Sequence, residues 1–122
     1  MTQNPIQIQV NTPYPMIVSY DVKAFILRML TLKNIASGEF EFTFTDNATI
    51  TEIHAKHMNL PTPTDIITFN LGTPQAIEGD IYISVEQATL NADTYNNTLD
   101  QEIKLLITHG ILHLLDYRDY TD

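Results

Sequence analysis

Two histidines near the end of the sequence are the residues best suited to chemistry. His109 and His113 are four positions apart. On a helix this spacing places two side chains on one face, so both imidazoles can reach the same metal ion. Asp119 follows His113 by six residues and can supply a third ligand if the helix ends first and the chain turns back at Asp116 and Tyr117. These residue types predict a site for one divalent metal ion.

The spacing His-x-x-x-His-x-x-x-x-x-Asp is also that of a class of zinc proteases, the metzincins. In those enzymes a glutamate follows the first histidine and a glycine turn precedes the third ligand. Here Gly110 replaces the glutamate and Asp116 replaces the glycine. Because that glutamate is the general base that activates water, its loss argues against proteolysis but leaves metal binding intact.

Length and composition limit the class of protein. The chain has 122 residues, 43% of them hydrophobic, which suits one globular domain over residues 1–122. It contains no cysteine, so disulfides and thiolate zinc sites are excluded and a reducing, cytoplasmic location is expected. No signal-peptide pattern opens the sequence and no apolar window reaches the length of a membrane span, so no membrane partner is expected.

The charge balance bears on nucleic-acid partners. Fifteen acidic and six basic residues give a formal net charge of −9, which disfavours long-range attraction to phosphate backbones. A general nucleic-acid binder is therefore not expected, and no DNA partner is expected. An RNA-cleaving enzyme stays possible, because a divalent cation can hold a scissile phosphate inside an acidic protein.

Apolar periodicity, caps and turn residues predict eight elements. Asp21, Ser84 and Thr98 are the expected N-caps of three helices, and Thr98 forms a capping-box signal with Gln101. The order predicts an α+β fold, in which one mixed sheet of about four strands is packed by helices and the metal-binding helix lies near the C-terminus. Strands are expected at 6–10, 39–45, 64–70 and 80–84, and helices at 21–33, 46–57, 85–92 and from 98 onward.

The strand patterns predict how the sheet is built. Residues 39–45 alternate phenylalanine with polar side chains, which indicates a buried face, a solvated face and a place near a sheet edge. Core burial explains these phenylalanines more simply than base stacking does. Residues 64–70 and 80–84 have the pattern of two interior strands joined as an antiparallel hairpin. The final helix should pack centrally on the sheet through Ile103, Leu106, Ile107, Gly110 and Leu114.

Three blocks together resemble the YbeY family of metal-dependent, single-strand-specific endoribonucleases that act in ribosomal RNA maturation. Residues 64–69 (TDIITF), 79–84 (GDIYIS) and 109–117 (HGILHLLDY) are similar to the family patterns T-D-V-[LI]-[ST]-F, G-D-I-x-I-[ST] and H-G-x-L-H-L-x-G-Y. Their order and spacing also match, so the resemblance covers nearly the whole chain. Any one block would be weak, whereas the ordered set is fairly specific.

This resemblance implies a set of site residues. His109, His113 and Asp119 would bind one metal ion, usually zinc, with Asp119 standing where many members have a third histidine. Gly110 is then expected, and the two histidines would act through a metal-activated water. We expect the cleft between the final helix and strand 64–70, with possible cleft or substrate contacts from Asp65, Thr68, His57 and Lys56.

The sequence also departs from the family pattern. Met58 stands where the family has an arginine; Lys56 or His57 could replace it, but neither offers the bidentate fork of a guanidinium. Asp116 stands at the family's glycine. The family continues past the third ligand into another helix, whereas this chain ends at Asp122, so the domain is expected to lack the usual C-terminal helix.

Several candidates have simpler explanations. Asp65 lies at the start of a strand, where a capping role in the preceding loop is a simpler explanation than catalysis. Asp80 follows Gly79, and its simplest explanation is a role in a turn. His54 and His57 are expected at the surface, and His57 is the better candidate for the cleft.

The leading hypothesis is a cytoplasmic, zinc-dependent endoribonuclease that acts on single-stranded ribosomal RNA, with a ribosomal subunit or ribosomal proteins as partners. One alternative is a ribosome-associated RNA- or protein-binding factor with weak or lost catalysis, which the methionine at position 58 motivates. The other is a metal-dependent hydrolase of another ester or amide, which the protease-like spacing suggests.

Overall fold

The computed structural model describes residues 6–58, 64–73 and 76–121, and within them the side chains except those of residues 57–58 and 116–121. The elements follow the order predicted from the sequence. They are β1 (Ile6–Asn11), α1 (Ser19–Leu32), β2 (Gly38–Thr45), α2 (Asn47–Met58), β3 (Ile66–Asn70), β4 (Glu78–Ser84), α3 (Val85–Thr94) and α4 (Leu99–Thr121).

The four strands form one mixed sheet in the order β1-β2-β4-β3. The pairs β1–β2 and β2–β4 are parallel, and β3–β4 is an antiparallel pair. The predicted α+β class and the predicted hairpin are therefore confirmed. The predicted strand positions are partly wrong: β2 is interior, whereas β3 is at the edge. The alternation of apolar and polar residues in β2 shows that one face of the strand is solvated. It does not show whether the strand is hydrogen-bonded to a neighbour along each of its two edges.

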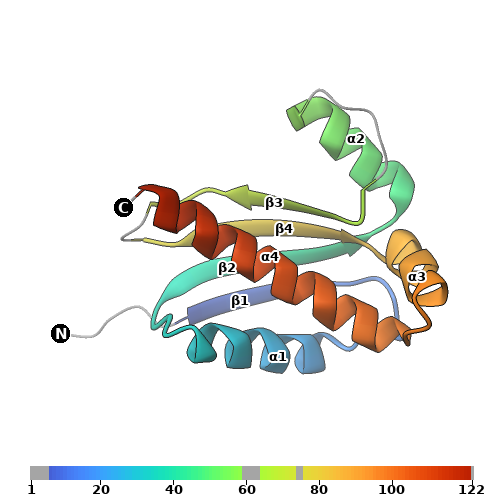
Figure 1. Ribbon diagram of the computed structural model, residues 1–122, viewed down its shortest axis with the longest axis horizontal. Coiled ribbons are helices and arrows are strands. Elements are labelled where there is room, and N and C mark those ends of the chain that lie inside the picture. Colours follow the sequence, from blue (N-terminus) through green and yellow to red (C-terminus); the bar gives the residue numbers. More distant parts are fainter. Residues whose placement is uncertain (1–5, 59–63, 74–75, 122) are drawn as a thin grey trace.

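The hydrophobic core lies between one face of the sheet and two helices, α1 and α4. Figure 1 shows α4 crossing the sheet diagonally with α1 beside it, while α2 and α3 lie near one end. Phe40, Phe42 and Phe44 of β2 are at most 3% exposed and pack in one cluster with side chains of both helices. Burial of one such ring contributes roughly 1.5–3 kcal/mol. The core explanation of the three phenylalanines is confirmed.

α1 begins differently from the sequence prediction. The helix starts at Ser19 and its N-cap is Val18, so Asp21 is not the cap and lies in the first turn. A carboxylate there still interacts favourably with the positive end of the helix dipole.

The other two predicted caps are confirmed. The hydroxyl of Ser84 accepts a hydrogen bond from the backbone N–H of Gln87 at the start of α3 (3.1 Å). At the start of α4, the backbone N–H of Gln101 donates to Thr98 Oγ1 (3.1 Å), and the backbone N–H of Thr98 donates to Gln101 Oε1 (2.8 Å). This reciprocal pair is the predicted capping box.

α4 is longer than the sequence suggested. The turn expected at Asp116 and Tyr117 is absent, and the helix continues to Thr121. No glycine or proline follows Gly110 in the sequence, so nothing interrupts the backbone hydrogen bonds of the helix. Among the described residues, no helix is long and apolar enough to cross a membrane.

The capping box allows a direct test of how α4 is held. Thr98→Ala should lower the free energy of unfolding by about 1 kcal/mol, because the first turn loses a hydrogen-bond acceptor. Thr98→Ser should lower the free energy of unfolding much less, since serine keeps the hydroxyl group that accepts the hydrogen bond. Urea denaturation of the three proteins measures the difference, and equal stabilities of wild type and Thr98→Ala would contradict the capping role.

Candidate functional site

A pocket of about 260 Å³ lies between α4 and the edge strand β3. This is where the sequence predicted a cleft between the final helix and strand 64–70. Its wall combines residues from three elements, α2, β3 and α4. The lining residues are His54, Ile66, Ile67, Thr68, His109, Gly110 and His113.

The two predicted histidines sit on the solvent side of a helix whose other side is buried. His109 and His113 are exposed, whereas Gly110, Ile111 and Leu114 between and beside them are buried. The buried residues fix the helix against the sheet, so the backbone that carries the imidazoles is held in place. Both imidazoles line the same pocket, as expected for residues four apart on a helix.

Gly110 allows α4 to lie close to the sheet beside the pocket. A Cβ atom at this position would lie 3.1 Å from Ile66 Cδ1 and 3.7 Å from Thr68 Oγ1. The first distance is shorter than ordinary van der Waals contact. A glutamate, as in the zinc proteases, would therefore push the helix away from β3. Close packing of α4 against β3 therefore explains the glycine at position 110, independently of any catalytic role.

The third predicted ligand is not tested by the structure. The backbone of Asp119 is helical within α4, and its side chain lies outside the described residues. Among the described side chains, no group of three His, Cys, Asp or Glu residues could hold a metal ion. What the described part offers is two exposed imidazoles on one helix face. This donor pair fits zinc, provided that further ligands complete the coordination.

The other predicted cleft residues have different positions. Thr68 lines the pocket, whereas Lys56 is exposed on α2 and is not among the lining residues. The side chains of His57 and Met58 lie outside the described residues. Asp65 accepts a hydrogen bond from Asn91 Nδ2 (3.1 Å), so it ties the start of β3 to α3 and lies outside the lining.

One pocket residue was missed by the sequence reasoning. His54 was expected at the surface, and His57 was favoured for the cleft, but His54 is half-buried and lines the pocket. The signal was present: Ile50 is fully buried, and residues four apart share one face of a helix. Position 54 therefore lies on the buried side of α2.

Asp80 is not a turn residue as predicted. It lies within β4, directly opposite Glu41 of β2, on the sheet face that α1 and α4 leave uncovered. Tyr82 Oη donates a hydrogen bond to Asp80 Oδ2 (3.2 Å). Burial raises the pKa of the Asp80 carboxyl; the hydrogen bond from Tyr82 lowers this pKa, and the negative charge of Glu41 raises it. Its neighbours on the strand, Gly79 and Ile81, point to the opposite face.

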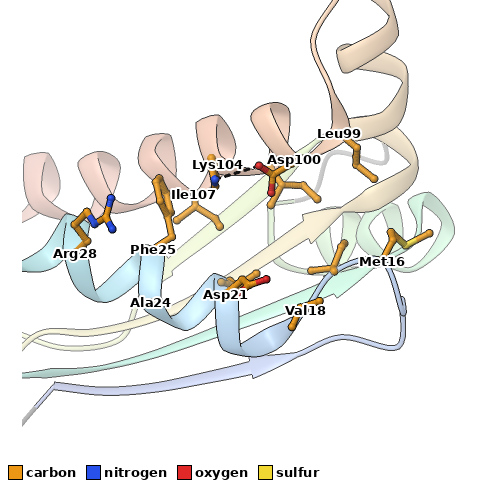
Figure 2. A pocket seen from close by; sticks show the side chains of 13 residues that line it. Met16, Val18, Asp21, Ala24, Phe25, Arg28, Leu99, Asp100, Lys104 and Ile107 are labelled. Atoms are coloured by element: carbon orange, nitrogen blue, oxygen red, sulfur yellow. Dashed lines mark ion pairs between the residues drawn. The ribbon is translucent and has the colours of Figure 1, made fainter.

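A larger hollow of about 550 Å³ lies between α1 and α4. Figure 2 shows its lining side chains, among them Phe25 and Arg28 from α1. Lys104 of α4 forms an ion pair with Asp100 (N–O distance 3.1 Å) and lies 5.8 Å from the centre of the Phe25 ring. The described lining of this groove includes no histidine, so none of the predicted metal-binding histidines lies there.

Comparison with known proteins shows what the chain is similar to. The family model described as "Endoribonuclease YbeY" matches residues 7–122. The "Endoribonuclease YbeY" of Flavobacterium psychrophilum is 34% identical over 98 residues, which cover 80% of this chain and 70% of the relative. That of Christiangramia forsetii is 33% identical over 102 residues, covering 84% and 71%.

A solved structure is similar as well. The solution structure of TM1509 from Thermotoga maritima superposes with a TM-score of 0.67 at 26% sequence identity. The match covers 89% of this chain and 71% of that one.

The close contact at Gly110 predicts a graded response to side-chain size. Gly110→Ala should change the free energy of unfolding by less than about 1 kcal/mol, because the better helix propensity of alanine offsets the contact with Ile66. Gly110→Leu should lower the free energy of unfolding by about 1–3 kcal/mol, since the larger side chain cannot fit between α4 and β3. Urea denaturation of the three proteins checks this order, and a Leu variant as stable as wild type would refute the packing role.

The raised pKa of Asp80 predicts a pH-dependent effect on stability. The folded protein holds this proton at pH values where the unfolded chain has lost it, so ionised Asp80 is destabilising above its folded-state pKa. Asp80→Asn should therefore raise the Tm at pH 7, and the gain should vanish as the pH falls below about 3.9, the ordinary Asp pKa.

Thermal melts from pH 3 to pH 7 measure this difference. Glu52→Gln, which removes one negative charge from the exposed side of α2, is the control and should not reproduce the gain. A gain that is independent of pH would contradict the explanation.

Proposed function

Since the chain belongs to the YbeY endoribonuclease family, we propose that it hydrolyses phosphodiester bonds within single-stranded RNA at the pocket between α4 and β3. The observation that carries the proposal is the exposed pair His109 and His113 in that pocket, together with the Thr68 hydroxyl. Hydrolysis adds water across a P–O bond: a water oxygen attacks phosphorus, and the departing ribose oxygen gains a proton.

The proposed ion is one zinc, and its proposed ligands are His109 and His113 with Asp119 as the third. Asp119 can join the two histidines only if the chain turns back after His113 when the ion binds, because in this structure α4 continues to Thr121. A bound zinc ion supplies Lewis acidity and lowers the pKa of a coordinated water. The overall charge of the chain supports a cation there. The formal net charge is −9, and the described lining residues include neither lysine nor arginine. A divalent ion would provide the positive charge that attracts a phosphate to this acidic protein.

The protein's own residues would orient the substrate. α4 carries both imidazoles on a backbone fixed by its buried side, and Thr68 on β3 can donate a hydrogen bond to a phosphate oxygen. The pocket, at about 260 Å³, suits a sugar-phosphate unit of one strand better than a double helix, which supports single-strand preference. In the proposal the substrate is ribosomal RNA, and cleavage takes place in the cytoplasm. The proposed partners are a ribosomal subunit or ribosomal proteins. Substrate, location and partners all rest on the family resemblance alone.

A second function is favoured by one specific observation. The described lining of the pocket offers no guanidinium to the phosphate, and methionine occupies position 58, where the family pattern has an arginine. A chain with these features could bind RNA or a ribosomal protein while cleaving slowly. Ribosome co-sedimentation without RNA cleavage at any zinc concentration would favour this function.

Removal of one proposed ligand tests the site. His113→Ala should abolish the binding of one zinc ion per chain, measured by atomic emission on purified protein, and should lower single-stranded RNA cleavage more than about 100-fold. The loss is expected to exceed the 10–100-fold that removal of an outer-shell partner of a metal ligand costs.

Leu105→Ala is the matched control, because Leu105 is exposed on the same helix outside the pocket lining. It should keep both zinc and activity. Full zinc content in His113→Ala, or cleavage at the wild-type rate, would refute the proposed site.

A further inference from the structure

The groove between α1 and α4 combines an apolar base with charged side chains along its sides. Its volume is about 550 Å³, and the buried side chains of Val22, Ile103 and Ile107 form part of its lining. Figure 2 shows charged side chains of both helices around this base. We propose that a second copy of this chain covers the groove, so that two copies form a symmetric dimer in which their α1 helices lie antiparallel. This inference goes beyond the proposed function and does not depend on it.

The charges that α1 presents to the groove complement those of a second, antiparallel α1. Asp21 and Arg28 both line the groove and lie seven residues apart, which is about two helical turns along one side of the helix. The midpoint between them falls between Ala24 and Phe25. A two-fold axis through this midpoint brings Asp21 of each copy opposite Arg28 of the other, so the same ion pair forms twice.

Both charged groups are available for this contact. Asp21 and Arg28 are exposed, and within the described part of the chain neither forms an ion pair or a side-chain hydrogen bond. Lys104, by contrast, pairs with Asp100 on the same helix and lies over the Phe25 ring. The two groove charges without a described partner therefore both come from α1 and have opposite signs.

Exposed apolar side chains extend the contact beyond the charged pairs. Leu32 is 68% exposed and follows Arg28 by four residues, on the same side of α1. The same two-fold axis brings Leu32 close to residues 16–18 of the second copy. In that segment Met16 and Val18 line the groove and are 65% and 50% exposed. Removing these side chains from water at both ends of the interface favours association.

The distribution of charge over the chain also favours this face. With a formal net charge of −9, two copies repel each other over most approaches. Residues 19–33, however, contain three basic residues and one acidic residue, so α1 and its C-cap do not share this negative charge. α1 and α4 also cover the sheet face opposite the acidic hollow. A dimer formed through the groove therefore keeps the two acidic sheet faces on its outside.

Sedimentation velocity of the full chain over a range of concentrations tests the inference. Wild type should shift from monomer to dimer as its concentration rises. Arg28→Glu should weaken dimerisation more than about 10-fold, because it sets two acidic side chains opposite each other at both symmetric contacts. Asp21→Lys should weaken it similarly, by setting two basic side chains opposite each other.

Two combinations of these variants test the antiparallel pairing itself. The double variant Asp21→Lys/Arg28→Glu should dimerise like wild type, since both ion pairs form again with their charges exchanged. A mixture of the two single variants should form a mixed dimer, because one chain then carries two basic groups at these positions and the other two acidic groups. Failure of both combinations to restore the dimer would refute the pairing of Asp21 with Arg28.

Leu32→Glu tests the apolar part of the interface and should also weaken dimerisation. Leu90→Glu is its matched control, because Leu90 is 56% exposed on α3 and lies outside the described groove lining; this variant should dimerise like wild type. All the substituted side chains are exposed, so circular dichroism should show the wild-type helix content in every variant.

A wild type that stays monomeric at every concentration would overturn the inference and leave the groove to a different partner. A wild-type dimer that both Arg28→Glu and Leu32→Glu leave intact would overturn it as well, because the two copies would then meet at another face.

Discussion

The close contact between α4 and the sheet is the constraint on which the site depends. Gly110 has no side chain, so the helix axis approaches Ile66 and Thr68 of the edge strand. At a second point of contact between α4 and the sheet, a Cβ atom at Gly79 of β4 would lie 2.6 Å from Leu114 Cδ1. Both glycines serve close packing, and the packing sets how far the exposed imidazoles of α4 stand from β3. The helix face that carries His109 and His113 and the β3 wall of the pocket are therefore held relative to each other by contacts of the hydrophobic core.

The sheet divides the molecule into an apolar face and a polar one. α1 and α4 cover the apolar face, and the uncovered face carries Glu39, Glu41, Glu78 and Asp80 around a shallow hollow. Like charges on neighbouring strands repel, and they also repel RNA. The described lining of the histidine pocket, by contrast, includes no acidic side chain. The acidic groups of the uncovered sheet face therefore lie apart from the pocket between α4 and β3.

Much of the fold could be predicted from local patterns. The capping box at Thr98 and Gln101 and the buried phenylalanines of β2 depend on residues close in sequence, and these predictions are confirmed. The start of α1 was misplaced because Asp21 suits a first turn as well as a cap. The predicted edge position of β2 was wrong because the pattern of one strand does not report its partners. The predicted turn after His113 was also wrong, since it came from a ligand-spacing argument, whereas backbone hydrogen bonds decide where a helix ends.

The sequence by itself determined that His109 and His113 lie on one face of a helix, because a spacing of four residues corresponds to one helical turn. It also determined the element order and the side of each element that is apolar. Only the tertiary structure decided that β3 is an edge strand and that α2 brings His54 to the same pocket as the α4 histidines. The physical reason is that contacts between residues far apart in sequence are set by how the apolar faces pack together, and no local spacing encodes that arrangement.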